Sequence, residues 1–430
     1  MRKIRLALFG LGTVGGGVVD ILKRHSDDFK RHQGVDLELV ACTARGPEEA
    51  ERLGIVDLYR SPEEIYADPD IDIVIELIGG TGFALSVIRD ALAAGKHVVT
   101  ANKAIMARYG KELFDLAESK NLYLGFEASV GAGIPIISSL KHSLTPNEIS
   151  SVLGIVNGTT NFMLSRMDED GLDYDVVLKE AQERGFAEAD PTADVEGHDA
   201  AAKIAILASI AFNSRVTIDQ VPTEGISKLA PADLEQARQM GYAIKLLAIA
   251  RRLEGGVDIR VHPTMIPLTH PLAGVNGVYN AIYVTGDAVG DTMLFGEGAG
   301  AGSAASGVMA DVIEIARFVA AGLEPVVGCT CTDELPLLPI DELETQYYVR
   351  LFVHDQPGVL AATSTIFSKH DVSIHSMIQS GCAEGECVNI IFLTHVTRES
   401  SIRAALEEIA DLDSVEDVAT LIRVQQDSAS

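Results

Sequence analysis

Basic residues are scarce in this sequence: 34 Lys and Arg stand against 62 Asp and Glu, which gives 430 residues a formal net charge of −28. A chain this acidic repels a phosphate backbone, and no run of Lys and Arg offsets that charge locally. Cysteine is scarce too, and five residues, an odd number, make no disulfide framework and indicate a reducing, cytoplasmic compartment. No apolar stretch is long enough to span a bilayer. We therefore expect neither nucleic acid nor a membrane as a partner.

The composition that remains is that of an ordinary globular chain, with 47% hydrophobic and 22% charged residues. A length of 430 residues predicts two to three domains. The opening MRKIRLALFGLG lacks a small-residue cleavage site and runs straight into a glycine motif. It therefore predicts a first β-strand and no signal peptide.

Residues 1–133 have the pattern of a parallel sheet with crossover helices. Short apolar runs alternate with segments long enough for a helix, and the runs are nearly continuous, as in strands buried on both faces. The predicted strands cover residues 3–9, 35–43, 70–78, 96–101 and 121–129. This is the doubly wound, Rossmann-like α/β fold of dinucleotide-binding domains.

The rest of the chain divides into three further parts that differ in composition and in hydrophobic pattern. Residues 134–322 predict an α+β substrate-binding and catalytic domain, whose last helix at 303–322 could return to the first domain. Residues 323–345 hold three prolines and two cysteines without a clear period, which is typical of a linker. Residues 346–430 follow the order βαββαβ, the ferredoxin-like arrangement.

The first strand ends in a G-x-G-x-x-G turn that opens directly into a helical pattern. In that context the glycines allow a tight turn, close approach of a pyrophosphate and close packing of helix on strand. The predicted cofactor-binding residues of the turn are Gly10, Gly12, Thr13, Val14 and Gly15.

The second strand ends without the carboxylate that accepts a hydrogen bond from the ribose of NAD. It reads VACTA and is followed by Arg45. A guanidinium at this place suits a 2′-phosphate, so the sequence favours NADP(H) over NAD(H). A solvated surface arginine is the alternative.

Two lysines are placed for chemistry. Lys103 follows the strand 96–101, at the edge of the sheet where ligands bind in open α/β folds. Lys203 and Asp199 are four residues apart on a helix predicted over 197–213, whose sequence is almost wholly apolar after its first turn. An exposed ion pair is the alternative, but a buried lysine beside carboxylates is a better candidate for a site because its pKa can be shifted.

Metal sites have weaker support. The spacings Cys329-x-Cys331 and Cys382-x4-Cys387 lack accompanying histidines, which argues against zinc. The loop 127–134 could offer backbone carbonyls to a hard cation.

With these motifs, the chain resembles the long form of homoserine dehydrogenase, which ends in an ACT regulatory domain. The resemblance extends over nearly the whole chain and is most specific at 185–203. The motifs that carry it are GLGTVGGG (10–17), TANKA (100–104), EASVGAGIPII (127–137), NGTTN (157–161), GFAEADPTADVEGHDAAAK (185–203), GEGAGAGSAAS (296–306) and the terminal YYVRLFVHDQPGVL.

The resemblance implies reversible NAD(P)H-dependent reduction of L-aspartate 4-semialdehyde to L-homoserine, in threonine and methionine biosynthesis. It makes Lys203 the proton donor to the aldehyde oxygen and Lys103 a second lysine that polarises this oxygen beside the cofactor. Glu188 and Asp199 would hold the substrate, and Glu188 would pair with the α-ammonium group of the substrate. A developing alkoxide does need cationic or hydrogen-bond donors. Gly185 and Gly300 would approach the cofactor.

The resemblance also implies two further ligands. A sodium ion would be held by Glu127 and by the carbonyls of Val130, Ala132 and Ile134. A free amino acid, threonine as feedback inhibitor, would bind the ACT domain at Asp355 and Gly358. That domain could instead serve dimerisation alone, and in either case we expect a homodimer or homotetramer.

Two other classes compete with this interpretation. A phosphorylating semialdehyde dehydrogenase needs a thiolate at the nicotinamide, and Cys42 lies at the ribose end while the other cysteines lie in the linker or the terminal part. A non-catalytic amino-acid sensor could keep the nucleotide fold as a scaffold. The joint presence of Lys103, Glu188, Asp199 and Lys203 favours the enzyme.

Overall fold

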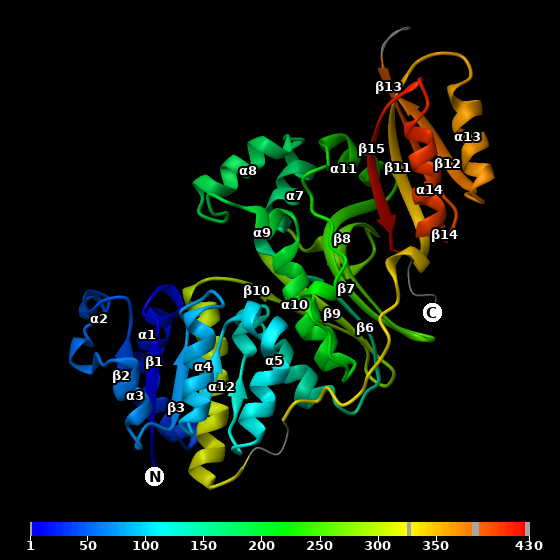
Figure 1. Ribbon diagram of the computed structural model, residues 1–430. Coiled ribbons are helices and arrows are strands. Elements are labelled where there is room, and N and C mark those ends of the chain that lie inside the picture. Colours follow the sequence, from blue (N-terminus) through cyan, green and yellow to red (C-terminus); the bar gives the residue numbers. More distant parts are fainter. Residues whose placement is uncertain (1, 325–327, 381–386, 426–430) are drawn as a thin grey trace. The chain divides into compact units, whose positions relative to one another are not determined.

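A computed structural model of the chain describes residues 2–324, 328–380 and 387–425 (Figure 1). By internal packing the chain divides into two compact units. The first contains Met1–Val156, Ala202–Val221 and Tyr279–Leu335, and the second contains Asn157–Ala201, Pro222–Val278 and Pro336–Ser430. The division falls inside helix α10 (His198–Ala211). The expected domain bounds at 133, 322 and 345 remain predictions, because packing units and sequence domains are not the same partition.

The first unit contains a five-stranded parallel sheet with strand order β2-β1-β3-β4-β5. Each strand forms where a continuous apolar run predicts one, which confirms the Rossmann-like fold, although the last three strands are shorter than their runs. The strands are β1 (Lys3–Phe9), β2 (Asp36–Thr43), β3 (Ile73–Glu76), β4 (His97–Thr100) and β5 (Leu124–Gly125).

Crossover helices accompany this sheet. Helix α12 packs against α1, and Val308 and Val312 of α12 share a buried core with Leu6 and Leu8 of β1. A side chain added at Gly17 of α1 would meet the Ala301 carbonyl oxygen at 2.6 Å, so these two helices approach closely. The helices of this unit are α1 (Thr13–Asp28), α2 (Pro47–Arg52), α3 (Pro62–Ala67), α4 (Phe83–Ala93), α5 (Lys103–Glu118), α6 (Ile136–Ser138) and α12 (Ala301–Ala321).

The first unit also contains an antiparallel arrangement of three strands. Strand β9 (Tyr279–Gly286) lies between β6 (Ile149–Ile155) and β10 (Gly290–Glu297). The sequence interpretation missed β6, whose short run ISSVLGI contains two serines and a glycine.

The second unit combines helices with a long hairpin. Strands β7 (Tyr242–Leu253) and β8 (Gly256–Pro267) pair antiparallel, joined by a turn at Glu254 and Gly255. The helices of the unit before its terminal part are α7 (Gly158–Asp170), α8 (Tyr174–Glu183), α9 (Thr192–Val195) and α11 (Pro231–Gln239).

The terminal part of the second unit has the predicted order βαββαβ, with a two-residue strand added. Its sheet has the order β15-β11-β13-β12, and α13 and α14 pack together on one face of it (Figure 1). Its elements are β11 (Glu344–His354), α13 (Val359–Lys369), β12 (Ile374–Ser380), β13 (Cys387–Thr394), β14 (Thr397–Arg398), α14 (Glu399–Ala410) and β15 (Val415–Val424). Within the described ranges no helix is both long enough and apolar enough to cross a membrane.

Candidate active site

The glycine turn between β1 and α1 needs glycine at two places for packing, and a third glycine faces open space. Gly10 has φ +93°, and a Cβ there would meet the Leu77 carbonyl oxygen at 2.6 Å. A Cβ at Gly15 would lie 2.0 Å from the Gly10 oxygen, whereas a Cβ at Gly12 would meet nothing within 4 Å. Gly12 therefore faces open space at the N-terminus of α1, where a phosphate would approach.

A cavity of about 620 Å³ lies beside this turn in the first unit. Its wall includes Gly10, Gly12 and Arg45, and Arg45 is exposed. Arg52 also lines it and donates to the Leu11 carbonyl oxygen at 2.8 Å, while Glu49 adds one carboxylate to the wall. The predicted arginine thus lies at the cavity, with a second arginine that the sequence interpretation did not name.

Lys103 begins helix α5, and the residues before it are fixed by a buried carboxylate. Thr100 donates to Glu76 at 2.6 Å, and the Asn102 backbone N–H donates to the Thr100 hydroxyl at 3.0 Å. The Asn102 side chain then caps α5 through the N–H of Ile105. Burial raises the pKa of the Glu76 carboxyl, against hydrogen bonds that lower it. The sequence interpretation missed Glu76, whose only signal was an acid at the end of an apolar strand.

Helix α10 is buried along almost its whole length, as its apolar sequence predicted. Lys203 is 7% exposed, and its Nζ donates to the Val156 carbonyl oxygen, just beyond β6, at 2.6 Å. Asp199, one turn earlier on the same helix, is also 7% exposed. The alternative of an exposed ion pair is therefore wrong, because neither side chain is at the surface.

Asn157 binds two carboxylates of the second unit, those of Asp194 and Asp199. Its side-chain Nδ2 donates to Asp194 at 2.7 Å and to Asp199 at 2.9 Å, while its Oδ1 accepts from the N–H of Thr160 and caps α7. One amide therefore fixes a helix and orients two acids. The sequence interpretation missed this role, although Asn157 opens the NGTTN motif.

Three other predicted residues lie on turns. Gly185 follows α8 with φ +74° and is exposed, as is Glu188. The Gln182 side chain donates to the Glu188 carbonyl oxygen at 3.1 Å, which fixes the Glu188 backbone. Gly300, with φ +116°, precedes α12 in the first unit. Both glycines meet a conformational need, whatever they bind.

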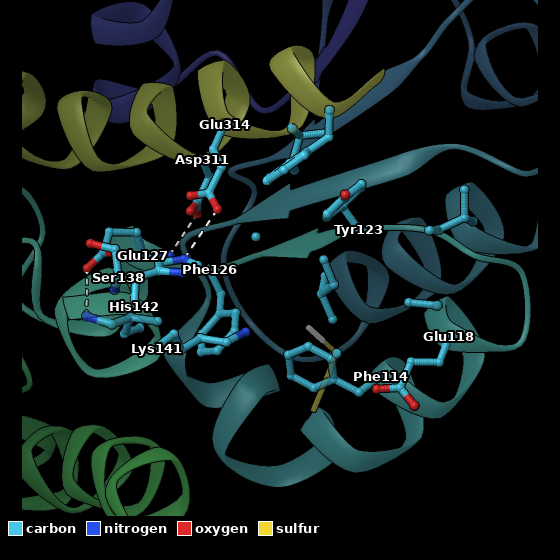
Figure 2. A pocket seen from close by; sticks show the side chains of 18 residues that line it. Phe114, Glu118, Tyr123, Phe126, Glu127, Ser138, Lys141, His142, Asp311 and Glu314 are labelled. Carbon is cyan, nitrogen blue, oxygen red and sulfur yellow. Dashed lines mark hydrogen bonds and ion pairs between the residues drawn. The ribbon is translucent and has the colours of Figure 1, made fainter. Parts of the chain in front are cut away.

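The loop of the expected cation site is tied down by hydrogen bonds (Figure 2). The two carboxylate oxygens of Glu127 accept from the N–H of Ile137 at 2.8 Å and of Ser138 at 2.6 Å, and its own N–H donates to Asp311 at 2.8 Å. Glu127 is 3% exposed, and burial raises the pKa of its carboxyl. Ala132 has φ +53° and Ile134 accepts from the N–H of Ile136. Among the described residues, no three His, Cys, Asp or Glu side chains gather as a metal site.

The expected effector loop follows β11. Asp355 is exposed and accepts from the Gln379 side chain of β12 at 3.4 Å. Gly358 has φ +99° and precedes α13. A carboxylate, an amide and a helix N-terminus thus lie along one loop and its neighbouring strand.

Cys42, the cysteine of the parallel sheet, does not support a thiol mechanism. Cys42 is buried, and burial raises the pKa of its thiol to about 11. Cys329 accepts from Arg215 at 3.0 Å. Cys42, Cys329 and Cys331 are free thiols, whereas Cys382 lies outside the described residues.

The chain matches family models along its length. Residues 10–127 match the homoserine dehydrogenase NAD-binding domain, residues 135–313 match homoserine dehydrogenase, and residues 347–414 match the ACT domain. The homoserine dehydrogenase of Synechocystis sp. is 45% identical over 430 residues, covering 98% of this chain and 99% of that protein. That of Neisseria gonorrhoeae is 42% identical over 431 residues, covering 99% of each. The chain belongs to the homoserine dehydrogenase family.

Solved structures of homoserine dehydrogenases agree. The crystal structure of one from Thiobacillus denitrificans matches with a TM-score of 0.94 and 44% identity over 99% of both chains. A hyperthermophilic archaeal homoserine dehydrogenase in complex with NADPH matches with a TM-score of 0.62 and 29% identity, over 73% of this chain and 98% of that one. The chain is an NAD(P)-dependent oxidoreductase acting on a CH–OH group, with a C-terminal ACT domain, and the enzyme prediction is confirmed.

Proposed function

We propose that the enzyme reduces L-aspartate 4-semialdehyde to L-homoserine, reversibly, with Lys203 as the proton donor. The observation that carries this proposal is the burial of Lys203 and Asp199 one turn apart on α10, each 7% exposed. Burial of an ammonium group raises the cost of its charge, which favours release of its proton to a developing alkoxide. The Val156 carbonyl oxygen fixes the Lys203 ammonium at 2.6 Å, so the donor is ordered before substrate arrives.

The other side chains bind and orient the substrate. The nicotinamide, when bound, supplies the hydride. Lys103 polarises the aldehyde oxygen beside the cofactor, Glu188 pairs with the α-ammonium group, and Asp199 binds the substrate from α10. The hydrogen bond from Asn157 supports this role, because it orients the Asp199 carboxylate.

We assign NADPH as the preferred cofactor. The support is Arg45 on the wall of the cavity beside Gly10 and Gly12, just beyond β2, whose carboxyl end carries no acid. Thr13, Val14 and the N-terminus of α1 complete the phosphate site, and the turns at Gly185 and Gly300 approach the cofactor.

A monovalent cation, sodium, is assigned to Glu127 and to the carbonyls of Val130, Ala132 and Ile134. All four donors are oxygens, as a hard cation prefers. Glu127 also supports a cation because its carboxylate is buried, at 3% exposed, where a bound positive charge would offset the cost of burying its negative charge.

Threonine is assigned as the effector of the ACT domain. The Asp355 carboxylate, already in reach of Gln379, suits the ammonium group, and the backbone at Gly358 and the start of α13 suit the carboxylate. Homo-oligomerisation is supported by an apolar patch in the first unit, where the rings of Phe295 (54% exposed) and Tyr279 (41% exposed) lie 5.0 Å apart between centroids, and Met293 of the same strand as Phe295 is exposed as well. The free thiols suit the cytoplasm.

Absorbance of the nicotinamide tests the substrate, cofactor and effector assignments together. The purified protein, with sodium present, is given aspartate semialdehyde and either NADPH or NADH, each with and without threonine. We expect faster oxidation of NADPH and slower turnover with threonine. A higher kcat/KM for NADH would contradict the cofactor assignment, and turnover indifferent to threonine would contradict the effector.

A further inference from the structure

The ACT domain joins the rest of the second unit at β8. Strand β15 pairs parallel with β8, with Arg423 opposite Thr264. The Arg423 side chain is 2% exposed, and its guanidinium donates to the buried Glu399 carboxylate of α14 at 2.8 Å from Nε and 2.5 Å from Nη2. Tyr347 of β11 donates to the same carboxylate at 2.9 Å. A buried charge cluster therefore lies where the ACT domain begins and ends.

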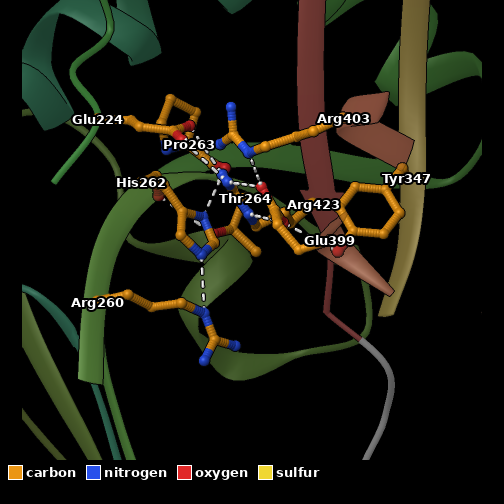
Figure 3. Close-up of polar contacts among 9 residues, drawn as sticks. All are labelled: Glu224, Arg260, His262, Pro263, Thr264, Tyr347, Glu399, Arg403 and Arg423. Atoms are coloured by element: carbon orange, nitrogen blue, oxygen red, sulfur yellow. Dashed lines mark hydrogen bonds and ion pairs between the residues drawn. The ribbon is translucent and has the colours of Figure 1, made fainter. Parts of the chain in front are cut away.

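Glu224 extends this cluster out of the ACT domain (Figure 3). Its carboxylate accepts from Arg423 at 2.8 and 2.9 Å and from Arg403 of α14 at 2.6 Å. Burial alone would raise the pKa of Glu224, but the two guanidinium groups hold it below its usual value. Glu224 is thus an ionised side chain held by two arginines of the ACT domain.

The backbone around Glu224 packs on the turn before α10. The Glu224 N–H donates to Val261 of β8 at 2.8 Å, and the Ile226 N–H donates to Val195 at 2.8 Å. A Cβ at Gly225 would lie 2.3 Å from the Val195 oxygen and 2.6 Å from Glu196 Cα, so no side chain fits between the two segments. A shift of Glu224 must therefore move the 195–197 turn as well.

That turn is the start of the active-site helix. The Gly197 carbonyl oxygen accepts the first helical hydrogen bond, from Ala201, at 2.9 Å. Gly197 has φ +81°, and a Cβ there would meet Thr223 Cγ2 at 3.0 Å. Asp199 lies in the first turn of the helix, two residues beyond Gly197.

We propose that Glu224 is a positioning residue through which the ACT domain places the N-terminus of α10 and so sets the affinity for the substrate. The proposal rests on the substrate role assigned to Asp199. Arg403 and Arg423 hold Glu224, Glu224 holds the segment 222–226, and that segment holds the turn from which Asp199 is presented. Loss of the Glu224 charge is expected to weaken substrate binding and to leave cofactor binding and the proton donor unchanged.

A second buried cluster provides the matched control. Asp233, at the start of α11, accepts from Arg350 of β11 at 2.7 and 3.0 Å and from Tyr348 at 3.1 Å. It is 0% exposed and, like Glu224, is held by an arginine of the ACT domain. Its other hydrogen bonds come from the Ala230 N–H and the Thr420 hydroxyl, and both of these residues lie outside the 195–197 turn.

The experiment compares steady-state constants of Glu224→Gln, Asp233→Asn, Asp199→Asn and Arg403→Gln in the full-length enzyme, with a thermal unfolding curve for each. For Glu224→Gln we expect KM for aspartate semialdehyde to rise about fivefold, with kcat and the KM for NADPH within about twofold of wild type. Asp233→Asn is expected to unfold at a lower temperature but to keep the substrate KM. Arg403→Gln should raise the substrate KM less than Glu224→Gln does. The variant with both substitutions should have the KM of Glu224→Gln alone, because Arg403 acts through Glu224.

Three results would overturn the proposal. An unchanged substrate KM in Glu224→Gln, alongside a raised KM in Asp199→Asn, would remove the positioning role alone. The same rise in Asp233→Asn would mean that loosening the ACT domain anywhere has this effect. An unchanged KM in Asp199→Asn would remove the substrate role on which the proposal rests, and the proposal with it.

Discussion

The glycine turn at 10–15 and the start of α10 at 197–203 both place functional groups at the beginning of a helix, but by different means. The turn works through its backbone: Gly10 and Gly15 make the close packing possible and Gly12 leaves space for a ligand. The start of α10 works through side chains that distant segments orient, such as Lys203 by Val156. A site built from backbone groups can be predicted from the spacing of residues in the sequence. A site built from side chains depends on partners that only the fold brings near.

The largest expected effect separates two glycines of the same turn. In Gly15→Ala the new Cβ would lie 2.0 Å from the Gly10 oxygen, so we expect the free energy of unfolding to fall by about 3 kcal/mol. Gly12→Ala adds a Cβ to open space, so stability should stay near wild type while the KM for NADPH rises about tenfold. Denaturant unfolding and steady-state kinetics measure the two effects. Equal stability of both variants would contradict the assigned division of roles.

The side-chain site is tested at Asn157, where one residue both caps α7 and orients Asp199. Asn157→Ser keeps a capping oxygen but loses the amide donor, whereas Asn157→Ala loses both. We expect both variants to raise the substrate KM about tenfold, and only Ala to lose about 1 kcal/mol more in unfolding free energy. A substrate KM at the wild-type value in Asn157→Ser would show that the Asn157 amide does not orient the Asp199 carboxylate for substrate binding.

The choice between NADPH and NADH tests the cavity beside the glycine turn at Arg45. Arg45→Asp is expected to shift the ratio of kcat/KM for NADPH over NADH toward NADH by about tenfold. Arg24→Asp, on an exposed face of α1, is the control for the change in charge. An unchanged ratio in Arg45→Asp would leave the arginine as a solvated surface residue.

The smallest expected effect is an acid sensitivity of the sheet that carries the turn. His97 Nδ1 accepts from the Tyr123 N–H at 3.0 Å, and burial lowers the pKa of His97 to about 4. The unfolded chain binds this proton below about pH 6.5, and the folded chain only near pH 4, so stability falls as pH drops through that window. With partial exposure taken into account, the His97 contribution is on the order of 1 kcal/mol. Urea unfolding of wild type and His97→Gln at pH 7 and pH 5 checks it, since a pH slope that His97→Gln leaves unchanged assigns the effect to other groups.

The sequence predicted the elements better than the contacts. The strands of the parallel sheet and the βαββαβ order of the ACT domain follow from apolar runs, and Gly12 and Arg45 lie at one cavity as their positions indicated. Strand β6 was missed because its serines and glycine interrupt the apolar pattern, and its pairing with β9 is a contact between distant segments.

The supporting residues of the site were missed for a related reason. Glu76 and Asn157 act through hydrogen bonds to residues 24 and 42 positions away, Thr100 and Asp199. A hydrogen bond between residues so far apart leaves no periodic pattern in the local sequence. The burial of Lys203 could be predicted because it depends only on the apolar sequence of its own helix.

The central claim, that Lys203 supplies the proton while the glycine turn holds the cofactor, is tested most directly in Lys203→Met. A fluorescence titration gives its Kd for NADPH, and a single-turnover mixing experiment with aspartate semialdehyde gives its rate, with Lys179→Met, 77% exposed, as the matched control. The account predicts a Kd within about twofold of wild type and a rate lower by about 100-fold or more. A wild-type rate in Lys203→Met would contradict it.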